Sequence, residues 1–308
     1  MAHGVTNYIR RFYLFDLMVT WENARRMRAR AAANKDDKKD DKKDDKKDQK
    51  IEEKKVAIPS KFQWKAKEHT SGAFTAELIQ TAKEICALGK GILAADESTG
   101  TIGKRFDGIK VENTHGNRQA YRELLFTCPG LSEYISGVIM FDETVRDTTK
   151  SGVKFTKVLR DRGIHCGIKV DTGLVPIGGT DDETLTQGLD GLGARCAEYY
   201  KLGCRFAKWR AVLKIGKNLP SKAAIEENAK ALARYGSICQ ANGLVPIIEP
   251  EILQDGDHSI DVCAQVSEKV FSCVMRELFS QHLLIEGLLL KPNMVTPGIG
   301  CKQRATSK

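Results

Sequence analysis

The sequence predicts an α/β fold with a parallel sheet, a (β/α)8 TIM barrel of which about six of the eight β/α units are present. After Ser60, short apolar runs alternate with longer amphipathic segments, and a charged residue stands at the carboxyl end of nearly every run. Charges at the carboxyl ends of successive parallel strands surround the mouth of such a barrel. An open doubly wound sheet is the alternative, although no GxGxxG follows any run.

The six runs predict strands buried on both faces, as parallel strands are. They span residues 91–98, 136–143, 166–171, 204–210, 244–251 and 284–292. Between them, segments such as 225–243 and 261–281 have the periodicity of amphipathic helices, the first ending near Gly243. Six β-then-α units in order indicate right-handed crossovers.

The barrel is expected to occupy residues 55–308, after two segments of different composition. Residues 1–34 form a basic amphipathic N-terminal extension, whose apolar part is too short to span a bilayer. It suits a transit peptide, a membrane-surface helix or an appended helix without a targeting role. Residues 35–54 form a charged, disordered linker, because its DDKK repeats place like charges at i and i+4. We interpret it as a passive spacer rather than a binding element.

Composition argues against some function classes. The net charge is +9, but the basic residues are dispersed through segments that also carry Asp and Glu. They form no basic stripe interleaved with aromatic residues, so nucleic-acid binding is not expected. The excess of cations suits a phosphorylated substrate equally well. The nine cysteines form no CxxC pair and the six histidines have no HxxH or HxxxH spacing, so no metal site is expected. The cysteines read as buried, reduced thiols of a cytosolic protein.

Six strings in register carry a specific resemblance. They are GILAADESTGTIGKR, FDET, GIKVD, FAKWRAVLKI, PIIEPEILQDGDH and LLLKPNMVTPG, within a similarity that runs from about Phe62 to Pro297. In these strings the chain resembles the class I, Schiff-base-forming fructose-1,6-bisphosphate aldolases. The resemblance implies reversible cleavage of this sugar bisphosphate in glycolysis, no cofactor or metal, a cytoplasmic location and usually a homotetramer.

Lys291, in LLLKP, is the expected imine-forming residue. An aldolase without a metal needs an electron sink, and a protonated lysine imine accepts the electron pair of the broken C–C bond. The attacking amine must be neutral, which requires desolvation or a neighbouring cation. Lys291 follows an apolar run, which favours desolvation; the alternative is a strand-end lysine that extends into solvent.

Lys208 and Arg210 lie two apart in FAKWR, so both point to one face of a strand and Trp209 to the other. The resemblance implies that Lys208 helps to lower the pKa of the nucleophile and assists carbinolamine formation, and that Arg210 binds substrate. The alternative is structural pairing with carboxylates.

Three acids complete the expected catalytic set. Glu249 and Glu251 share one face of EPE, where two carboxylates push each other's pKa values apart. By resemblance, Glu249 transfers protons in the Schiff-base steps, Glu251 tunes it, and Asp96 acts on the C4 hydroxyl of the substrate. Asp96 could instead cap the helix that follows it.

The resemblance assigns the substrate phosphates to further residues near the first strand: Ser98, Thr101, Lys104, Arg105 and Arg118. Hydroxyls near a helix N-terminus and cationic side chains are suitable phosphate donors. The family usually has a lysine directly after KVD, where this chain has Thr172, so one phosphate anchor is expected to be absent.

The resemblance stops before the family's last two strands, which carry further phosphate donors. We therefore expect an incomplete barrel whose first and sixth strands have unpaired edges. A shortened product and a partner that supplies the remainder are both consistent with this pattern. The functional alternative to an aldolase is a catalytically inactive partial barrel that acts as a binding or scaffold protein.

Overall fold

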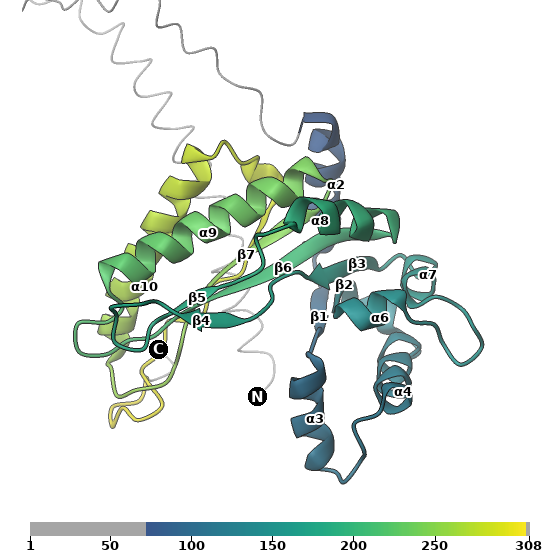
Figure 1. Ribbon diagram of the computed structural model, residues 1–308, viewed down its shortest axis with the longest axis horizontal. Coiled ribbons are helices and arrows are strands. Elements are labelled where there is room, and N and C mark those ends of the chain that lie inside the picture. The colour runs from purple at the N-terminus through teal and green to yellow at the C-terminus, as the bar shows by residue number, and fades with distance from the viewer. Residues whose placement is uncertain (1–71, 306–308) are drawn as a thin grey trace, which may run out of the picture. The chain divides into compact units, whose positions relative to one another are not determined.

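The computed structural model describes residues 72–305, and Figure 1 shows how their helices surround the sheet. The predictions for the extension at 1–34 and for the linker at 35–54 lie outside these residues, as does the start of the barrel segment at 55–71. Among the described residues, no helix is long and apolar enough to cross a membrane.

A six-stranded parallel sheet forms the centre of the described fold, in the order β1-β2-β3-β6-β7-β8. Its strands are β1 (Gly91–Ala95), β2 (Ile135–Met140), β3 (His165–Lys169), β6 (Cys204–Leu213), β7 (Val245–Ile252) and β8 (Leu289–Leu290). All six predicted strands are confirmed, and each pairs with the next of the six in chain order. This is the order of strands in a (β/α) barrel, with β1 and β8 at the edges within residues 72–305.

The connections between these strands are helical, as predicted. The helices are η1 (Gly72–Phe74), α2 (Thr75–Ile85), α3 (Thr99–Asp107), α4 (His115–Phe126), α5 (Leu131–Tyr134), α6 (Asp142–Arg146), α7 (Phe155–Arg160), α8 (Leu192–Lys201), α9 (Lys222–Ala241), α10 (Ile260–Ser280) and η2 (Ile285–Gly287). The long helices α9 and α10 cover β6 and β7 (Figure 1). Ser221 and Ser259 cap them by accepting a hydrogen bond from a backbone N–H three residues on.

Trp209 shows which face of the sheet packs against the helices. Its indole is fully buried and stacks on Tyr235 of α9, with ring centroids 5.3 Å apart. The Tyr235 hydroxyl donates a hydrogen bond of 2.7 Å to the Ala207 carbonyl, so the helix is tied to the strand it covers. The sequence prediction that Trp209 points away from Lys208 and Arg210 is therefore confirmed.

Phe206, on the opposite face of β6, anchors the inner core at the amino-terminal end of the strands. It is fully buried and clusters with Ile247 of β7, Leu289 of β8 and Leu78 of α2. A Cβ built on Gly167 would lie 2.3 Å from the Phe206 ring, and one on Gly137 would lie 3.0 Å from it. The aromatic ring thus fills a space that exists because two neighbouring strands have no side chain there.

A small antiparallel hairpin follows β3 and was not predicted. It consists of β4 (Leu174–Pro176) and β5 (Thr184–Thr186). Each strand has three residues, too few for a periodic pattern to stand out from a loop. Pro176 also disfavours a strand assignment.

The cysteine prediction is confirmed for six residues and wrong for others. Six thiols are buried: Cys166, Cys196, Cys204, Cys239, Cys263 and Cys273. Burial raises the pKa of Cys166 to about 12, which keeps this thiol protonated and unreactive. Cys86 and Cys128 are exposed because they follow the ends of α2 and α4, where the amphipathic pattern has stopped.

Gly167→Ala is expected to destabilise the fold by about 1–3 kcal/mol, because the added methyl group would overlap the buried Phe206 ring. Gly91→Ala, in β1, is the matched control, since nothing lies within 4 Å of its Cβ position. Urea unfolding followed by tryptophan fluorescence gives the free energy of unfolding of each variant. Equal stability of the two variants would show that Phe206 does not need the space above Gly167.

Candidate active site

Three adjacent strands change from apolar to charged at the same level of the inner face. Phe206 is followed two positions on by Lys208 in β6, and Ile247 by Glu249 in β7. Leu289 of β8 is likewise followed by Lys291, which lies directly after the strand. Because alternate residues of a strand share a face, the three charged groups lie on the same face as Phe206, Ile247 and Leu289, two residues nearer the carboxyl ends. We call these three apolar residues the apolar floor of the site.

Glu249 is the centre of this cluster. Its carboxylate is only 4% exposed, and Lys291 Nζ donates to its Oε1 at 2.5 Å. Lys208 Nζ lies 3.8 Å from its other oxygen, Oε2. One buried carboxylate therefore stands between the two lysines that the sequence assigned to Schiff-base chemistry.

Lys208 also reaches Asp96, which follows β1. Its Nζ donates a hydrogen bond of 3.2 Å to Asp96 Oδ2. Burial lowers the pKa of Lys208, but the attraction of Asp96 and Glu249 and the hydrogen bond to Asp96 more than offset it, so its pKa lies above the ordinary value. Lys208 is thus a protonated cation at neutral pH, as its expected role requires.

Lys291 is more exposed than the sequence suggested, with 55% of its side chain accessible. The preceding strand is buried, but the residue itself lies past the end of β8. Among the described residues, desolvation is therefore not what would prepare this amine. The sequence analysis named two features that could prepare the amine, desolvation and a neighbouring cation. The second is present, because Lys208 lies near the other oxygen of Glu249.

Arg210 forms an ion pair through its Nε with Glu251 Oε2. This hydrogen bond raises the pKa of Arg210, and its guanidinium remains charged. The two carboxylates of EPE thus face different cations, Glu249 the lysines and Glu251 the arginine. Lys208 and Arg210 thus pair with carboxylates, which was the structural alternative to a catalytic role. The carboxylates in these pairs, Glu249 and Glu251, are the ones that the resemblance assigns to catalysis.

Lys169 is a further cation at this site that the sequence reasoning missed. It ends β3, next to Lys208 in the strand register, and its Nζ lies 2.5 Å from Asp171 Oδ1. The signal was present in the sequence, because Lys169 precedes Asp171 by two residues at the end of a predicted strand. Alternation along a strand puts both on one face.

The first βα connection holds most of the residues predicted to bind phosphate. Ser98 is the N-cap of α3 and accepts a hydrogen bond of 3.4 Å from Thr101 N, so Asp96 does not cap this helix. Lys104 and Arg105 lie in the last turn of the same helix and are exposed. Arg105 pairs with Glu97, which makes it part of an ion-pair network rather than an unattached cation.

Arg118 is largely enclosed by protein groups. Its Nε lies 3.0 Å from each oxygen of Glu143, and its Nη1 donates to the Asn113 carbonyl and side-chain oxygens. A phosphate would have to compete with these contacts for the guanidinium. Thr172 is exposed, and its backbone N–H donates to the Gln187 carbonyl.

Comparisons with known proteins agree on one family. The family model described as fructose-bisphosphate aldolase class-I matches residues 77–308. The chain is 62% identical over 227 residues to the cytosolic fructose-bisphosphate aldolase 5 of Arabidopsis thaliana, covering 74% of this chain and 63% of the relative. It is 59% identical to the fructose-bisphosphate aldolase of Dictyostelium discoideum, covering 76% of this chain and 67% of that protein.

A solved structure gives the same result. The fructose-bisphosphate aldolase of Plasmodium falciparum, crystallised with TRAP and a small-molecule inhibitor, is 56% identical and superposes with a TM-score of 0.75. The match covers 76% of this chain and 68% of that one. The matched part of this chain thus spans less than two thirds of the length of the Arabidopsis relative.

Lys208→Met is expected to cost about 3–5 kcal/mol of unfolding free energy, because it leaves Asp96 and Glu249 without the buried cation between them. Lys214→Met is the control: it removes a pair with Asp182, whose side chain is 88% exposed, and is expected to cost less than about 1 kcal/mol. Urea unfolding at pH 7 compares the two.

The pH dependence gives a second check on Lys208. Because its folded-state pKa is raised, the stability it contributes is fully present below the ordinary lysine value of 10.5 and is lost as the pH rises through the higher folded value. The difference between wild type and Lys208→Met should therefore stay constant from pH 7 to 9 and shrink above about pH 10.5. A difference that already shrinks between pH 7 and 9 would contradict the assignment.

Proposed function

The chain belongs to the class I fructose-bisphosphate aldolase family, and we propose that it cleaves fructose 1,6-bisphosphate reversibly to dihydroxyacetone phosphate and glyceraldehyde 3-phosphate. The observation that carries the proposal is the placement of Lys291 Nζ and Lys208 Nζ on opposite oxygens of the buried Glu249. This arrangement at the carboxyl ends of the strands supports the proposal of Lys291 as nucleophile, Glu249 as proton carrier and Lys208 as fixed positive charge.

In the proposed mechanism, Lys291 attacks the C2 ketone of the open-chain sugar. Glu249, at 2.5 Å, accepts a proton from the nitrogen and passes it to the former ketone oxygen, which gives the neutral carbinolamine. A second proton, taken up by Glu249 from solvent, then converts the carbinolamine hydroxyl into water, which leaves. The product is a protonated imine between Lys291 Nζ and C2. The Lys208 ammonium, on the other side of Glu249, stabilises the partial negative charge that the ketone oxygen carries during the attack.

Cleavage then requires a base at the C4 hydroxyl, and we assign this role to Asp96. It lies 3.2 Å from Lys208 Nζ, which holds its carboxylate at the inner face. Removal of the hydroxyl proton breaks the C3–C4 bond and releases the aldehyde, and the electron pair passes into the imine to form an enamine. Protonation of that enamine at C3 and hydrolysis of the imine release the ketone product and regenerate Lys291.

The phosphate groups require cations and N–H or O–H donors outside this cluster. We propose Arg210 together with Lys104, Arg105, Ser98, Thr101 and Arg118, which the family resemblance assigns to substrate binding. Ser98 and Thr101 present hydroxyls 3.1 Å apart at the start of α3. Arg210 is 41% exposed beside Glu251, within reach of solvent. Positioning of both phosphates would hold the ketone at Lys291.

Family membership also supports two broader proposals. Several relatives are named cytosolic or cytoplasmic isozymes, which supports a cytoplasmic location. The homotetramer usual in the family is the assembly we propose, and light scattering on the purified chain measures it.

Reduction with borohydride in the presence of dihydroxyacetone phosphate should attach the ketone product to Lys291 alone. Peptide mass mapping locates the added mass, and the Lys291→Arg variant should show none. Lys208 and Lys169 are internal controls, because both are lysines of the same face. Label on either of them would refute the assignment of the nucleophile.

Glu249→Gln should lower kcat for cleavage by roughly 10²–10⁴-fold, because the amide cannot shuttle the proton between Lys291 and the carbinolamine. A coupled assay for glyceraldehyde 3-phosphate measures it. Glu198→Gln, half-exposed on α8 and paired with Arg146, is the matched control and should leave kcat unchanged. A wild-type chain that shows neither turnover nor trapping would favour the inactive binding-protein alternative.

A further inference from the structure

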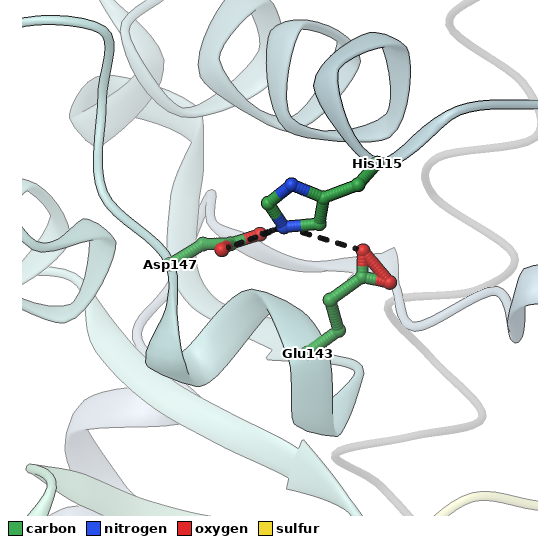
Figure 2. Close-up of side chains that lie close together, drawn as sticks. All are labelled: His115, Glu143 and Asp147. Carbon is green, nitrogen blue, oxygen red and sulfur yellow. Dashed lines mark hydrogen bonds and ion pairs between the residues drawn. The ribbon is translucent and has the colours of Figure 1, made fainter.

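His115, Glu143 and Asp147 converge at a point that the proposed reaction does not use. His115 is the first residue of α4, Glu143 lies in α6, and Asp147 follows the end of α6. Figure 2 shows the imidazole Nε2 directed at both carboxylates. The sequence pattern did not indicate this group because its members are separated by 28 and 4 residues and come from α4, from α6 and from the residue after α6.

The spacing of the three side chains suits a small cation. His115 Nε2 lies 3.0 and 3.1 Å from the two oxygens of Asp147 and 3.7 Å from Glu143 Oε1. One ligand atom from each residue can be chosen so that all lie within 4.8 Å of one another. Ligands at about 2.0–2.1 Å from a tetrahedral ion are separated by about 3.3 Å. Small side-chain rotations would therefore bring all three onto one ion.

The charge balance also calls for a cation here. Glu143 and Asp147 are both carboxylates, and both lie within 4 Å of His115 Nε2. Arg118 contacts both oxygens of Glu143 and so compensates one carboxylate. For Asp147, the partner among the described side chains is His115. A bound cation would compensate the negative charge of Asp147.

Hydrogen bonds hold α4, which carries His115, and the segment around Asp147 in place without an ion. The Thr114 side chain caps α4 by accepting from Asn117 N at 3.2 Å. Gln119 Nε2 donates to the Thr148 carbonyl at 2.7 Å, which ties α4 to the residue after Asp147. The Phe155 backbone N–H donates to the Asp147 carbonyl. The backbone on both sides of the cluster is therefore fixed before a ligand arrives, which lowers the entropic cost of binding.

We propose that His115, Glu143 and Asp147 bind a divalent transition-metal ion of the Zn²⁺ class, with water in the remaining position. One imidazole nitrogen and two carboxylate oxygens are typical Zn²⁺ ligands, whereas Mg²⁺ and Ca²⁺ prefer oxygen ligands throughout. Glu143 Oε1 binds the ion while Oε2 keeps its contact with Arg118, which orients the carboxylate. This inference does not rest on the proposed aldolase reaction.

Isothermal titration of the full chain with Zn²⁺ tests the proposal, with His115→Ala and Asp147→Asn as the disrupting variants. Wild type should show a site whose affinity falls at least about tenfold in each variant. His165→Ala is the matched control, because within residues 72–305 His165 pairs with one carboxylate, that of Glu84, at 2.8 Å. The Zn²⁺ affinity of this variant should equal that of wild type. Far-UV circular dichroism confirms that every variant is folded.

A second readout identifies the ligands. Co²⁺ bound by one nitrogen and carboxylate oxygens in a tetrahedral site gives visible d–d absorption, which should be present in wild type and in His165→Ala and absent in His115→Ala. Equal Zn²⁺ affinity of wild type and His115→Ala would overturn the proposal and leave the cluster as an ion pair between a protonated histidine and two acids. Binding of Mg²⁺ as tight as that of Zn²⁺ would also overturn it.

Discussion

The contact between Lys208 and Asp96 depends on the curl of the sheet, and so does the rest of the candidate active site. The two residues belong to β6 and to the end of β1, which are separated by β2 and β3. In a flat sheet three strand spacings would put them about 14 Å apart. Their 3.2 Å hydrogen bond therefore requires a sheet curved toward its inner face. The same curvature brings the carboxyl ends of the strands toward one another, which is where a (β/α) barrel does its chemistry.

The apolar floor, formed by Phe206, Ile247 and Leu289, stabilises this curvature of the sheet. Phe206 lies against Gly137 and Gly167, where a side chain on either strand would collide with its ring. Leu78 of α2 closes the cluster from below, so the inner face is filled at the amino-terminal end. Two residues further along each strand, the surroundings change from apolar to ionic. The apolar floor and the charged site thus both depend on the alternation of side chains between the two faces of each strand. A one-residue change of register in one strand would move its apolar and its charged side chains to the other face.

Features set by alternation along one strand could be predicted from the sequence, and features set by contacts between distant strands could not. The six strands, the opposite directions of Trp209 and Lys208, and the shared face of Glu249 and Glu251 all follow from local pattern. The contacts of Glu249 with both Lys208 and Lys291 do not, because they depend on curvature and register. The group of His115, Glu143 and Asp147 escaped a search based on spacing because it joins residues from segments far apart in the chain.

The difference in burial between Glu249 and Lys291 has a chemical consequence. The carboxylate is 4% exposed and lies between Lys208 and Lys291, while the Lys291 side chain is 55% exposed. A nucleophile must be reached by a substrate that arrives from solvent, whereas its proton acceptor must stay in one place while several intermediates form. Lys208 places a positive charge beside the buried carboxylate, and the attraction of Asp96 helps to raise the pKa of Lys208. This arrangement suits the proposed roles, in which Glu249 carries protons from a fixed position and Lys291 stays accessible to the substrate.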